Sequence, residues 1–297
     1  MNSISSLLGC RYPILQGAMG IISNPEMVAA VSEAGGFGLL ATAFAADPEY
    51  VRDQVRATRK LTDRPFGANL QMMNPLYPDF AKVLAEEGVR AVTASGGSLK
   101  ALMPKMKELG IKVIAVVPTV DVARKAEDLG VDAVIAEGTE SGGIQGFRGA
   151  ATMVLVPAVA DAVKIPVIAA GGIGDRRGYR AAFALGASGV QVGTRFIVTK
   201  ECIAHEKYKH ILVETNETGT MVFNLGPFQA RLLVSTVDRS GSENPAEDAP
   251  RSGGGVESME EAWIRGKVEG GALPAGEVCG LIRSVTSVRE VIEEMVS

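Results

Sequence analysis

Two glycine-containing motifs in the second half of the chain have the composition of a phosphate-binding site. AAGGIGD contains Gly171, Gly172 and Asp175, and QVGTRF contains Gly193 and Thr194. Each motif follows a short apolar run, and backbone N–H groups at the start of a following helix attract a phosphate dianion. Glycines at these positions could instead serve only tight turns. Two such motifs after neighbouring runs favour the phosphate site.

Small or polar residues also follow other apolar runs. The motif QGAMG contains Gly17, Ala18 and Met19, which suit a flat ring lying over main chain, although a short turn has the same composition. Asn69 could bind a heteroaromatic ring or a ribityl-type chain, or only cap a turn. Glu137 could accept hydrogen bonds from hydroxyls or act as a base, or bind backbone amides alone.

The segment ESGGIQGFRG, residues 140–149, follows an apolar run that ends in a carboxylate. Its glycines predict a loop that approaches a ligand or another chain segment closely. Gly143 precedes an aliphatic residue, Ile144, at the tip of this loop. An aliphatic tip indicates a contact with an apolar group.

Eight apolar runs precede these motifs, and each is too short for a helix and rich in β-branched residues. Within each run the apolar residues follow one another without alternating with polar residues, which is typical of strands covered on both faces. The runs begin at Pro13, Phe37, Phe66, Val89, Ile111, Val131, Ile165 and Ala187.

Amphipathic helical stretches separate the runs, and glycine ends most of them. The first, residues 24–35, opens with Asn24 as N-cap and Pro25 at the first helical position. Strand and helix alternating eight times predict an α/β fold, a (β/α)8 TIM barrel, and a doubly wound open sheet is the alternative. A TIM barrel collects ligand-binding residues at the carboxyl ends of its strands, often with a phosphate site after the last two.

The alternation stops after the eighth run. Residues 200–280 contain two segments with helical character, CIAHEKYKHILVET and PFQARLLVSTV, and a polar segment, DRSGSENPAEDAPRSGGGVES, expected to be a mobile loop. SVREVIEEMVS would supply the eighth helix. We therefore predict a barrel from residues 1–199 and 281–297, with a small, mainly helical insertion at 200–280 covering its mouth.

Composition excludes several classes of partner and site. A net charge of -4 and a pI near 5.5 argue against a nucleic-acid or anionic-membrane partner. Three cysteines without a CxxC spacing indicate neither a zinc site nor a disulfide framework. No apolar window is long enough for a membrane span, and the first residues lack the pattern of a signal peptide, so a cytoplasmic protein is expected.

PILQGAM, FGANL, EGTESGG, IPVIAAGGIGD and VQVGTRF closely resemble the FMN-dependent family of nitronate monooxygenases and type II enoyl-acyl-carrier-protein reductases. The likeness runs nearly end to end. The segments GGALPAGEVCGLI and KECIAHEKYK are more similar to the reductase branch. The resemblance implies FMN in the barrel mouth, with its phosphate on the two glycine motifs named above and Gln191, Asn69, Ala18 and Met19 near the flavin. It also implies that the loop with Glu137 and Gly143 packs beside the ring.

The sequence departs from the family pattern at one position of this loop. Both branches usually have glycine-glycine-histidine, and this chain has Ile144. The two histidines, His205 and His210, fall in a helical stretch away from the loop. Isoleucine cannot remove a proton from a carbon acid, so nitroalkane turnover should be poor, and no catalytic residue is assigned.

Hydride transfer depends more on the cofactor and on orientation than on such a base. The first hypothesis is therefore NADH- or NADPH-dependent reduction of a small 2-enoyl thioester by an FMN oxidoreductase, expected to be a homodimer. The alternatives are a nitronate monooxygenase that uses O2 and a flavin-binding protein without turnover.

Overall fold

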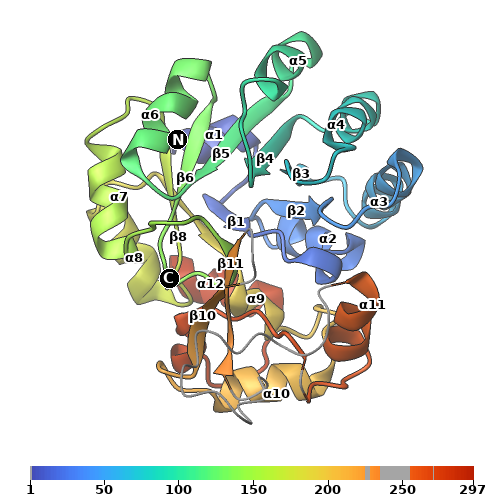
Figure 1. The fold of residues 1–297 in the computed structure, drawn as a ribbon, viewed down its shortest axis with the longest axis vertical. Coiled ribbons are helices and arrows are strands. Elements are labelled where there is room, and N and C mark those ends of the chain that lie inside the picture. The colour runs from blue at the N-terminus through green and yellow to red at the C-terminus, as the bar shows by residue number, and fades with distance from the viewer. Residues whose placement is uncertain (1, 225–227, 235–254, 270) are drawn as a thin grey trace.

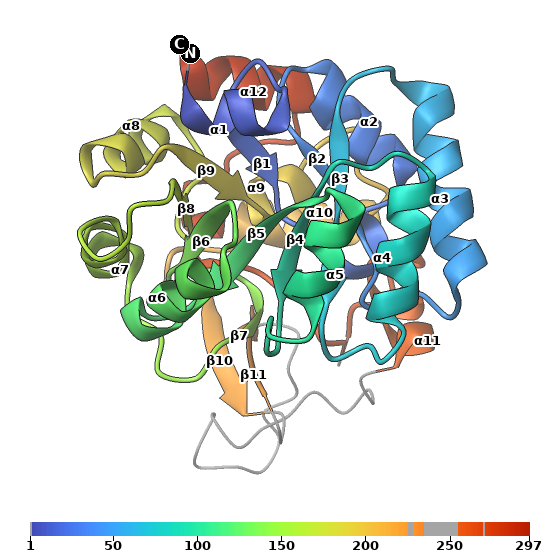
Figure 2. The same ribbon diagram turned by 90° about the horizontal axis from the view of Figure 1, so that it is seen from above.

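The eight apolar runs form eight parallel strands in the computed structural model, which describes residues 2–224, 228–234, 255–269 and 271–297. Their order in the sheet is β1-β9-β8-β6-β5-β4-β3-β2. Each strand lies within or beside its predicted run (Figures 1 and 2). The strands are β1 (Ile14–Gln16), β2 (Gly38–Ala41), β3 (Phe66–Gln71), β4 (Ala91–Ser95), β5 (Lys112–Val117), β6 (Ala133–Glu137), β8 (Val167–Ala170) and β9 (Gly189–Val192).

Hydrogen bonds between β1 and β2 close the sheet into a barrel. Leu15 and Phe37 form a parallel bridge. The N–H of Gln16 donates to the carbonyl of Phe37 at 3.0 Å, and the N–H of Phe37 donates to Ile14 at 2.9 Å. The buried Gln16 side chain extends this contact, because its Oε1 accepts from the N–H of Leu39 at 3.1 Å. The prediction of a TIM barrel is confirmed, and the doubly wound alternative is excluded.

Helices follow the strands around the outside of the barrel, where one large core lies between the two layers. They are α2 (Pro25–Glu33), α3 (Pro48–Leu61), α4 (Tyr77–Glu86), α5 (Leu102–Leu109), α6 (Val120–Leu129), α7 (Thr152–Ala160), α8 (Arg176–Ala184) and α12 (Val288–Val296). In α3, Asp47 is the N-cap and accepts from the N–H of Tyr50 at 2.8 Å. Val51 and Val55 lie one turn apart and are buried, which fixes the inward face of this helix.

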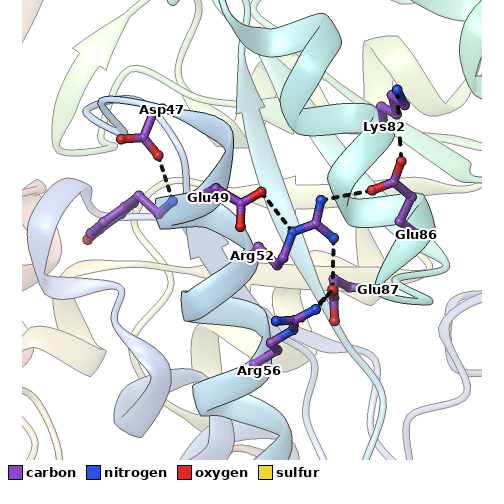
Figure 3. A network of polar contacts seen from close by, with 8 residues as sticks. Asp47, Glu49, Arg52, Arg56, Lys82, Glu86 and Glu87 are labelled. Carbon is purple, nitrogen blue, oxygen red and sulfur yellow. Dashed lines mark hydrogen bonds and ion pairs between the residues drawn. The ribbon is translucent and has the colours of Figure 1, made fainter.

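The outer face of α3 carries an ion-pair network with α4 (Figure 3). The Arg52 guanidinium contacts Glu49 at 3.1 Å, Glu86 at 2.8 Å and Glu87 at 2.9 Å. Arg56 also contacts Glu87, at 2.8 Å. These contacts hold two neighbouring outer helices together.

The interior of the barrel is a second, smaller core. Leu15, Ile135 and Ile168 belong to it, and so do Ile4 and Leu8 of a short helix, α1 (Ser3–Leu8). This helix closes the amino end of the barrel and was not predicted. Its local signal is Asn2, whose side chain accepts from two N–H groups of the first turn. With that end closed, we expect a ligand to enter from the opposite end of the barrel.

The segment after β9 contains a small sheet as well as helices. Its described elements are α9 (Thr194–Ile197), α10 (Glu206–Glu214), β10 (Thr220–Asn224), β11 (Gln229–Leu233), α11 (Val256–Met259), a π-helical turn η3 (Glu260–Ile264) and a 3-10 turn η4 (Glu277–Leu281). In Figure 1 they lie together below the barrel. Two antiparallel pairings order the small sheet β10-β11-β7, where β7 (Gly143–Gln145) belongs to the loop after β6.

The helical prediction for PFQARLLVSTV is therefore wrong where the structure describes it, although helical elements outweigh strands in the described part of the insertion. Ala, Arg and Leu favour helix, but the backbone groups of residues 229–233 pair with two strands from elsewhere in the chain. The polar segment expected to be a mobile loop lies outside the described residues, except at its end, where α11 begins. Among the described helices, none has the length and apolar character to cross a membrane.

Candidate functional site

Four polar side chains form a ring at the carboxyl ends of the barrel strands, which we name the mouth ring. They are Asn69 on β3, Ser95 on β4, Glu137 on β6 and Gln191 on β9, and all four are half-buried. Their strand neighbours Leu70, Ala94, Ala136 and Val190 belong to the outer core. Because successive side chains of a strand point to opposite faces, the mouth ring faces the barrel axis. It lies directly above the apolar interior.

The hydrogen bonds of Asn69 fix its amide in the mouth. Its Nδ2 donates to the hydroxyls of Thr93 at 2.9 Å and Ser95 at 3.2 Å. Its backbone carbonyl accepts from the hydroxyl of Thr42 at 2.7 Å. Thr93 and Ser95 were not among the predicted site residues. A fixed amide can bind a polar ligand without first being ordered.

Gln191 is the mouth-ring residue with a free amide, since no hydrogen bond of its side chain is found in the described chain. The glycine at position 17 lies against it, because a Cβ there would sit 3.5 Å from Cδ of Gln191. The N–H of Gly17 donates to the carbonyl of Val192 at 2.8 Å, which fixes the start of the loop after β1. Gln191 can therefore donate to and accept from a ligand.

The loop after β1 brings Ala18 and Met19 to the same place. Ala18 packs on the interior core. The N–H of Met19 donates to the Ser23 hydroxyl at 2.7 Å, and this hydroxyl accepts from the Gln16 side chain at 2.8 Å. A Cβ at Gly193 would lie 3.8 Å from the Met19 sulfur, so the loops after β1 and β9 adjoin. Together they form an apolar floor that suits a flat ring.

Unpaired backbone N–H groups gather in the loops after β8 and β9, which we name the phosphate corner. Gly171 and Gly172 have φ angles of 99° and 71°, which favour glycine. In the described residues, the N–H groups of Gly171, Gly172, Gly193 and Thr194 donate no hydrogen bond. Unpaired donors in a half-buried loop indicate a site for an acceptor such as phosphate.

Two N–H groups at the start of α8 are already occupied. The Asp175 carboxylate caps α8 and accepts from the N–H groups of Arg177 at 2.8 Å and Gly178 at 3.1 Å. The prediction that a helix start after β8 presents free N–H groups is wrong for Arg177 and Gly178, because both of these N–H groups already donate to the Asp175 carboxylate. The glycine loops and the start of α9 remain as the donors.

Glu137 is the titratable member of the mouth ring. Burial raises its pKa from 4.5 to about 7, and a hydrogen bond with Ser141 opposes the rise. Near neutral pH the carboxyl is thus shared between its protonated and ionised forms. It can both donate and accept a hydrogen bond, as ribityl hydroxyls or a proton transfer would require.

The tip of ESGGIQGFRG is part of the small sheet. Gly143 has a φ angle of 77° and pairs with Arg231, and Ile144 pairs with Ala230. The Gln145 side chain is buried and donates to the carbonyl of Thr139 at 2.9 Å. Ile144 is partly exposed to solvent, with 41% of its surface accessible. Pairing with β11 therefore holds the backbone of Gly143–Gln145 in a fixed orientation.

Residues 272–277 join the small sheet to the phosphate corner, and we name this segment the strap. It belongs to the stretch GGALPAGEVCGLI, which carries part of the family resemblance and was not assigned to the site from the sequence. The Trp263 indole donates to the carbonyl of Ala272 at 2.7 Å. The N–H of Gly276 donates to the Thr194 hydroxyl at 2.9 Å, and the N–H of Glu277 donates to the carbonyl of Glu140 at 3.0 Å. The strap holds the loops after β6 and β9 at a fixed separation.

The side chain of Glu140 was not predicted either. Its carboxylate accepts from the N–H of Thr152 at 2.8 Å and from the Thr152 hydroxyl at 2.9 Å. The same hydroxyl lies 3.0 Å from the carbonyl of Gly171. Glu140 therefore caps α7 and, through the Thr152 hydroxyl, is linked to the backbone of the phosphate corner.

Neither histidine belongs to the mouth ring. His205 is the N-cap of α10, where its Nδ1 accepts from the N–H of Lys207 at 3.1 Å, and His210 lies within α10. The described residues hold no group of three or more histidine, cysteine or acidic side chains that could bind a metal ion. The residues present fit FMN: free amides for a phosphate, polar side chains for a ribityl chain, and an apolar floor for a ring.

Comparison with known proteins supports this chemistry. A family model described as nitronate monooxygenase matches residues 2–96 and 81–297. The structure of FabK from Thermotoga maritima, a type II enoyl-ACP reductase, is 40% identical, covers 100% of this chain and 95% of that chain, and has a TM-score of 0.90.

Two curated relatives are similar over most or all of the chain. One is the (3aS,4S,5R,7aS)-5-hydroxy-7a-methyl-1-oxo-octahydro-1H-indene-4-carboxyl-CoA dehydrogenase of Rhodococcus jostii, 30% identical over 100% of this chain and 95% of that protein. The other is a probable nitronate monooxygenase of Staphylococcus saprophyticus, 34% identical over 75% of each chain. The chain belongs to the nitronate monooxygenase family, whose members are FMN-dependent oxidoreductases.

Proposed function

We propose that this protein binds FMN in the barrel mouth and uses NADH or NADPH to reduce the double bond of a 2-enoyl thioester. The observation that carries the proposal is the phosphate corner, where four unpaired N–H groups adjoin a polar ring and an apolar floor. The 40% identity to FabK supports the reductase branch. The CoA thioester in the name of the Rhodococcus relative supports the thioester.

In this proposal each part of the mouth binds one part of FMN. The phosphate accepts hydrogen bonds from Gly171, Gly172, Gly193 and Thr194. Asn69 and Glu137 bind the ribityl chain, and Gly17, Ala18, Met19, Gly143 and Gln191 surround the ring. Bound FMN supplies the hydride-transfer chemistry.

Exposed apolar side chains around the mouth support an acyl substrate. Phe44 follows β2, Met73 follows β3, and Ile144 and Phe147 follow β6, and all four are exposed. Large exposed apolar side chains that gather at a ligand-binding end often mark a binding surface. They would cover the acyl chain of a thioester and exclude water from it.

Reduction of the double bond also requires one proton at the α-carbon. The side chain of Ile144 has no proton to transfer. Glu137 is the titratable side chain of the mouth ring. With its pKa near 7, Glu137 can hold that proton at neutral pH. Water is the other source, and an E137Q variant with an unchanged reduction rate would assign the proton to water.

Oxidation of alkyl nitronates by O2 is the second candidate, because the matching family model and the Staphylococcus relative carry that name. A nitronate has already lost its proton, so this activity does not require a base at position 144. Oxygen uptake with propionate 3-nitronate and without pyridine nucleotide would favour it over the first proposal.

Anaerobic stopped-flow absorbance tests the two proposals together. FMN-loaded protein is mixed first with NADH or NADPH and then with crotonyl-CoA. We expect bleaching of the flavin by one nucleotide and its reoxidation by the thioester. Flavin that neither nucleotide bleaches contradicts the reductase proposal, and without nitronate oxidation it indicates a flavin-binding protein without turnover.

Three further points belong to the same proposal. The described parts of residues 200–280 act as an insertion that covers the mouth, since β11 pairs with the loop after β6 and the strap contacts Thr194. A cytoplasmic location agrees with three buried, free thiols. Sedimentation of the purified protein would test the predicted homodimer.

A further inference from the structure

Arg195 carries a buried positive charge and is the residue after Thr194 of the phosphate corner. It lies on α9, and only 6% of it is exposed. Its guanidinium donates to the Thr286 hydroxyl at 2.6 Å and to the carbonyls of Val198 at 3.1 Å and Ser284 at 3.5 Å. These acceptors are all neutral. In the described chain no carboxylate forms an ion pair with Arg195.

A buried cation without an ionic partner is unfavourable, because burial removes its hydration. Burial accordingly lowers the pKa of Arg195 below its usual range. Glu294 and Glu290 on α12 oppose this effect through space, without direct contact. The three neutral acceptors do not explain why a charged side chain stands at this position, because a neutral donor could also donate hydrogen bonds to them.

The position of Arg195 suggests what the charge interacts with. Its Cβ would lie 3.9 Å from a Cβ added at Gly174, so the root of the side chain packs against the loop after β8. The preceding residue, Thr194, contributes one of the unpaired N–H groups. The charge is therefore shielded from water, on a side chain whose first carbon adjoins both loops of the phosphate corner.

We propose that Arg195 is a positioning residue that strengthens binding of the flavin phosphate by its charge, without touching the phosphate. This inference rests on the proposed function. It assigns to Arg195 a role separate from its hydrogen bonds, which clamp α9 to residues 284–286. A purely structural Arg195 would stabilise the fold and affect any flavin equally.

Riboflavin separates the two roles, because it has the ring and ribityl chain of FMN and lacks the phosphate. Dissociation constants of both flavins are measured by fluorescence quenching on flavin-free protein at low ionic strength. The quantity compared among variants is the preference, the riboflavin constant divided by the FMN constant. Wild-type protein should prefer FMN.

Arg195→Met removes the charge and should reduce the preference about tenfold, the scale of a charge–charge interaction in partly buried surroundings. Arg195→Lys keeps the charge and should retain most of the preference. Thr286→Val removes the 2.6 Å hydrogen bond but keeps the charge, so it should weaken both flavins by the same factor.

Two exposed variants on α12 test the same idea even if the Arg195 variants do not fold. Glu294→Gln removes a carboxylate that acts on Arg195 and should raise the preference about twofold. Glu293→Gln is the matched control, because it removes a neighbouring exposed carboxylate with no such effect. The gain from Glu294→Gln should vanish in concentrated salt.

An Arg195→Met protein with the wild-type preference would overturn the inference and leave Arg195 as a clamp. If that protein does not fold, equal preferences in Glu294→Gln and Glu293→Gln would overturn it. Wild-type protein that binds neither flavin would instead contradict the proposed function, so the two failures are distinguishable.

Discussion

Replacing Glu137 with glutamine should make the flavin-free protein more stable at neutral pH. In the folded protein the pKa of Glu137 rises from 4.5 to about 7, because burial disfavours the ionised carboxyl. The folded state therefore holds the proton more tightly than the unfolded state does. The stability linked to this proton is fully present below pH 4.5 and is lost as the pH rises towards 7.

Each unit of pKa difference corresponds to about 1.4 kcal/mol, so the loss is at most about 3 kcal/mol. Glutamine has a similar shape and does not titrate. The E137Q variant should accordingly gain roughly 2 to 3 kcal/mol relative to wild type between pH 5 and pH 8. For a chain of this length, that corresponds to a rise in Tm of roughly 5 °C.

Urea unfolding of the flavin-free proteins at pH 5, 6, 7 and 8 provides the measurement. Comparing E137Q with wild type at each pH cancels the titration of all other groups. Glu293→Gln removes an exposed carboxylate and serves as the control. A stability difference between E137Q and wild type that stays constant from pH 5 to pH 8 would refute a raised pKa at Glu137.

Three more predictions concern the loop, the corner and the outer helices. Ile144→His should raise turnover of neutral nitroalkanes by roughly 100-fold or more, measured as oxygen uptake, while turnover of nitronates changes little; equal rates would show that no base is missing. Gly172→Ala and Gly110→Ala both place alanine at a positive φ, 71° and 66°, and should each cost about 1 kcal/mol of stability in urea unfolding. Only Gly172→Ala should also weaken FMN, and equal FMN affinities would remove Gly172 from the site. Arg52→Gln should lower Tm slightly at low salt and less in 1 M NaCl, because its ion pairs are exposed to screening; an effect that salt does not reduce would contradict this.

The barrel is predictable from the sequence because its strands are covered on both faces. Runs such as the one beginning at Ile111 are then apolar at nearly every position. Several of the helices between the runs also begin at a capping side chain, as α3 does at Asp47. The small sheet is not predictable in this way. Gly143–Gln145 becomes a strand only by pairing with Gln229–Leu233, and no local pattern identifies so distant a partner. QARLL consists largely of residues that favour helix, yet it forms a strand because it pairs with segments from elsewhere in the chain.

The predicted site residues do come together at the carboxyl ends of the strands, because the alternation of strand and helix fixes that end. What the sequence does not reveal is which donors are free. Asp175 and the N–H groups of α8 satisfy one another, whereas those of Gly171 and Gly172 stay unpaired. The contact of the strap with Thr194 depends on tertiary packing between segments far apart in the chain.

The central claim is that the loops after β8 and β9 bind the phosphate of FMN. A crystal structure of the FMN-loaded protein tests it most directly. We expect the phosphate within hydrogen-bonding distance of the N–H groups of Gly172, Gly193 and Thr194, with the flavin ring above Ala18. A flavin phosphate bound elsewhere, or a mouth without flavin at saturating FMN, would contradict the account.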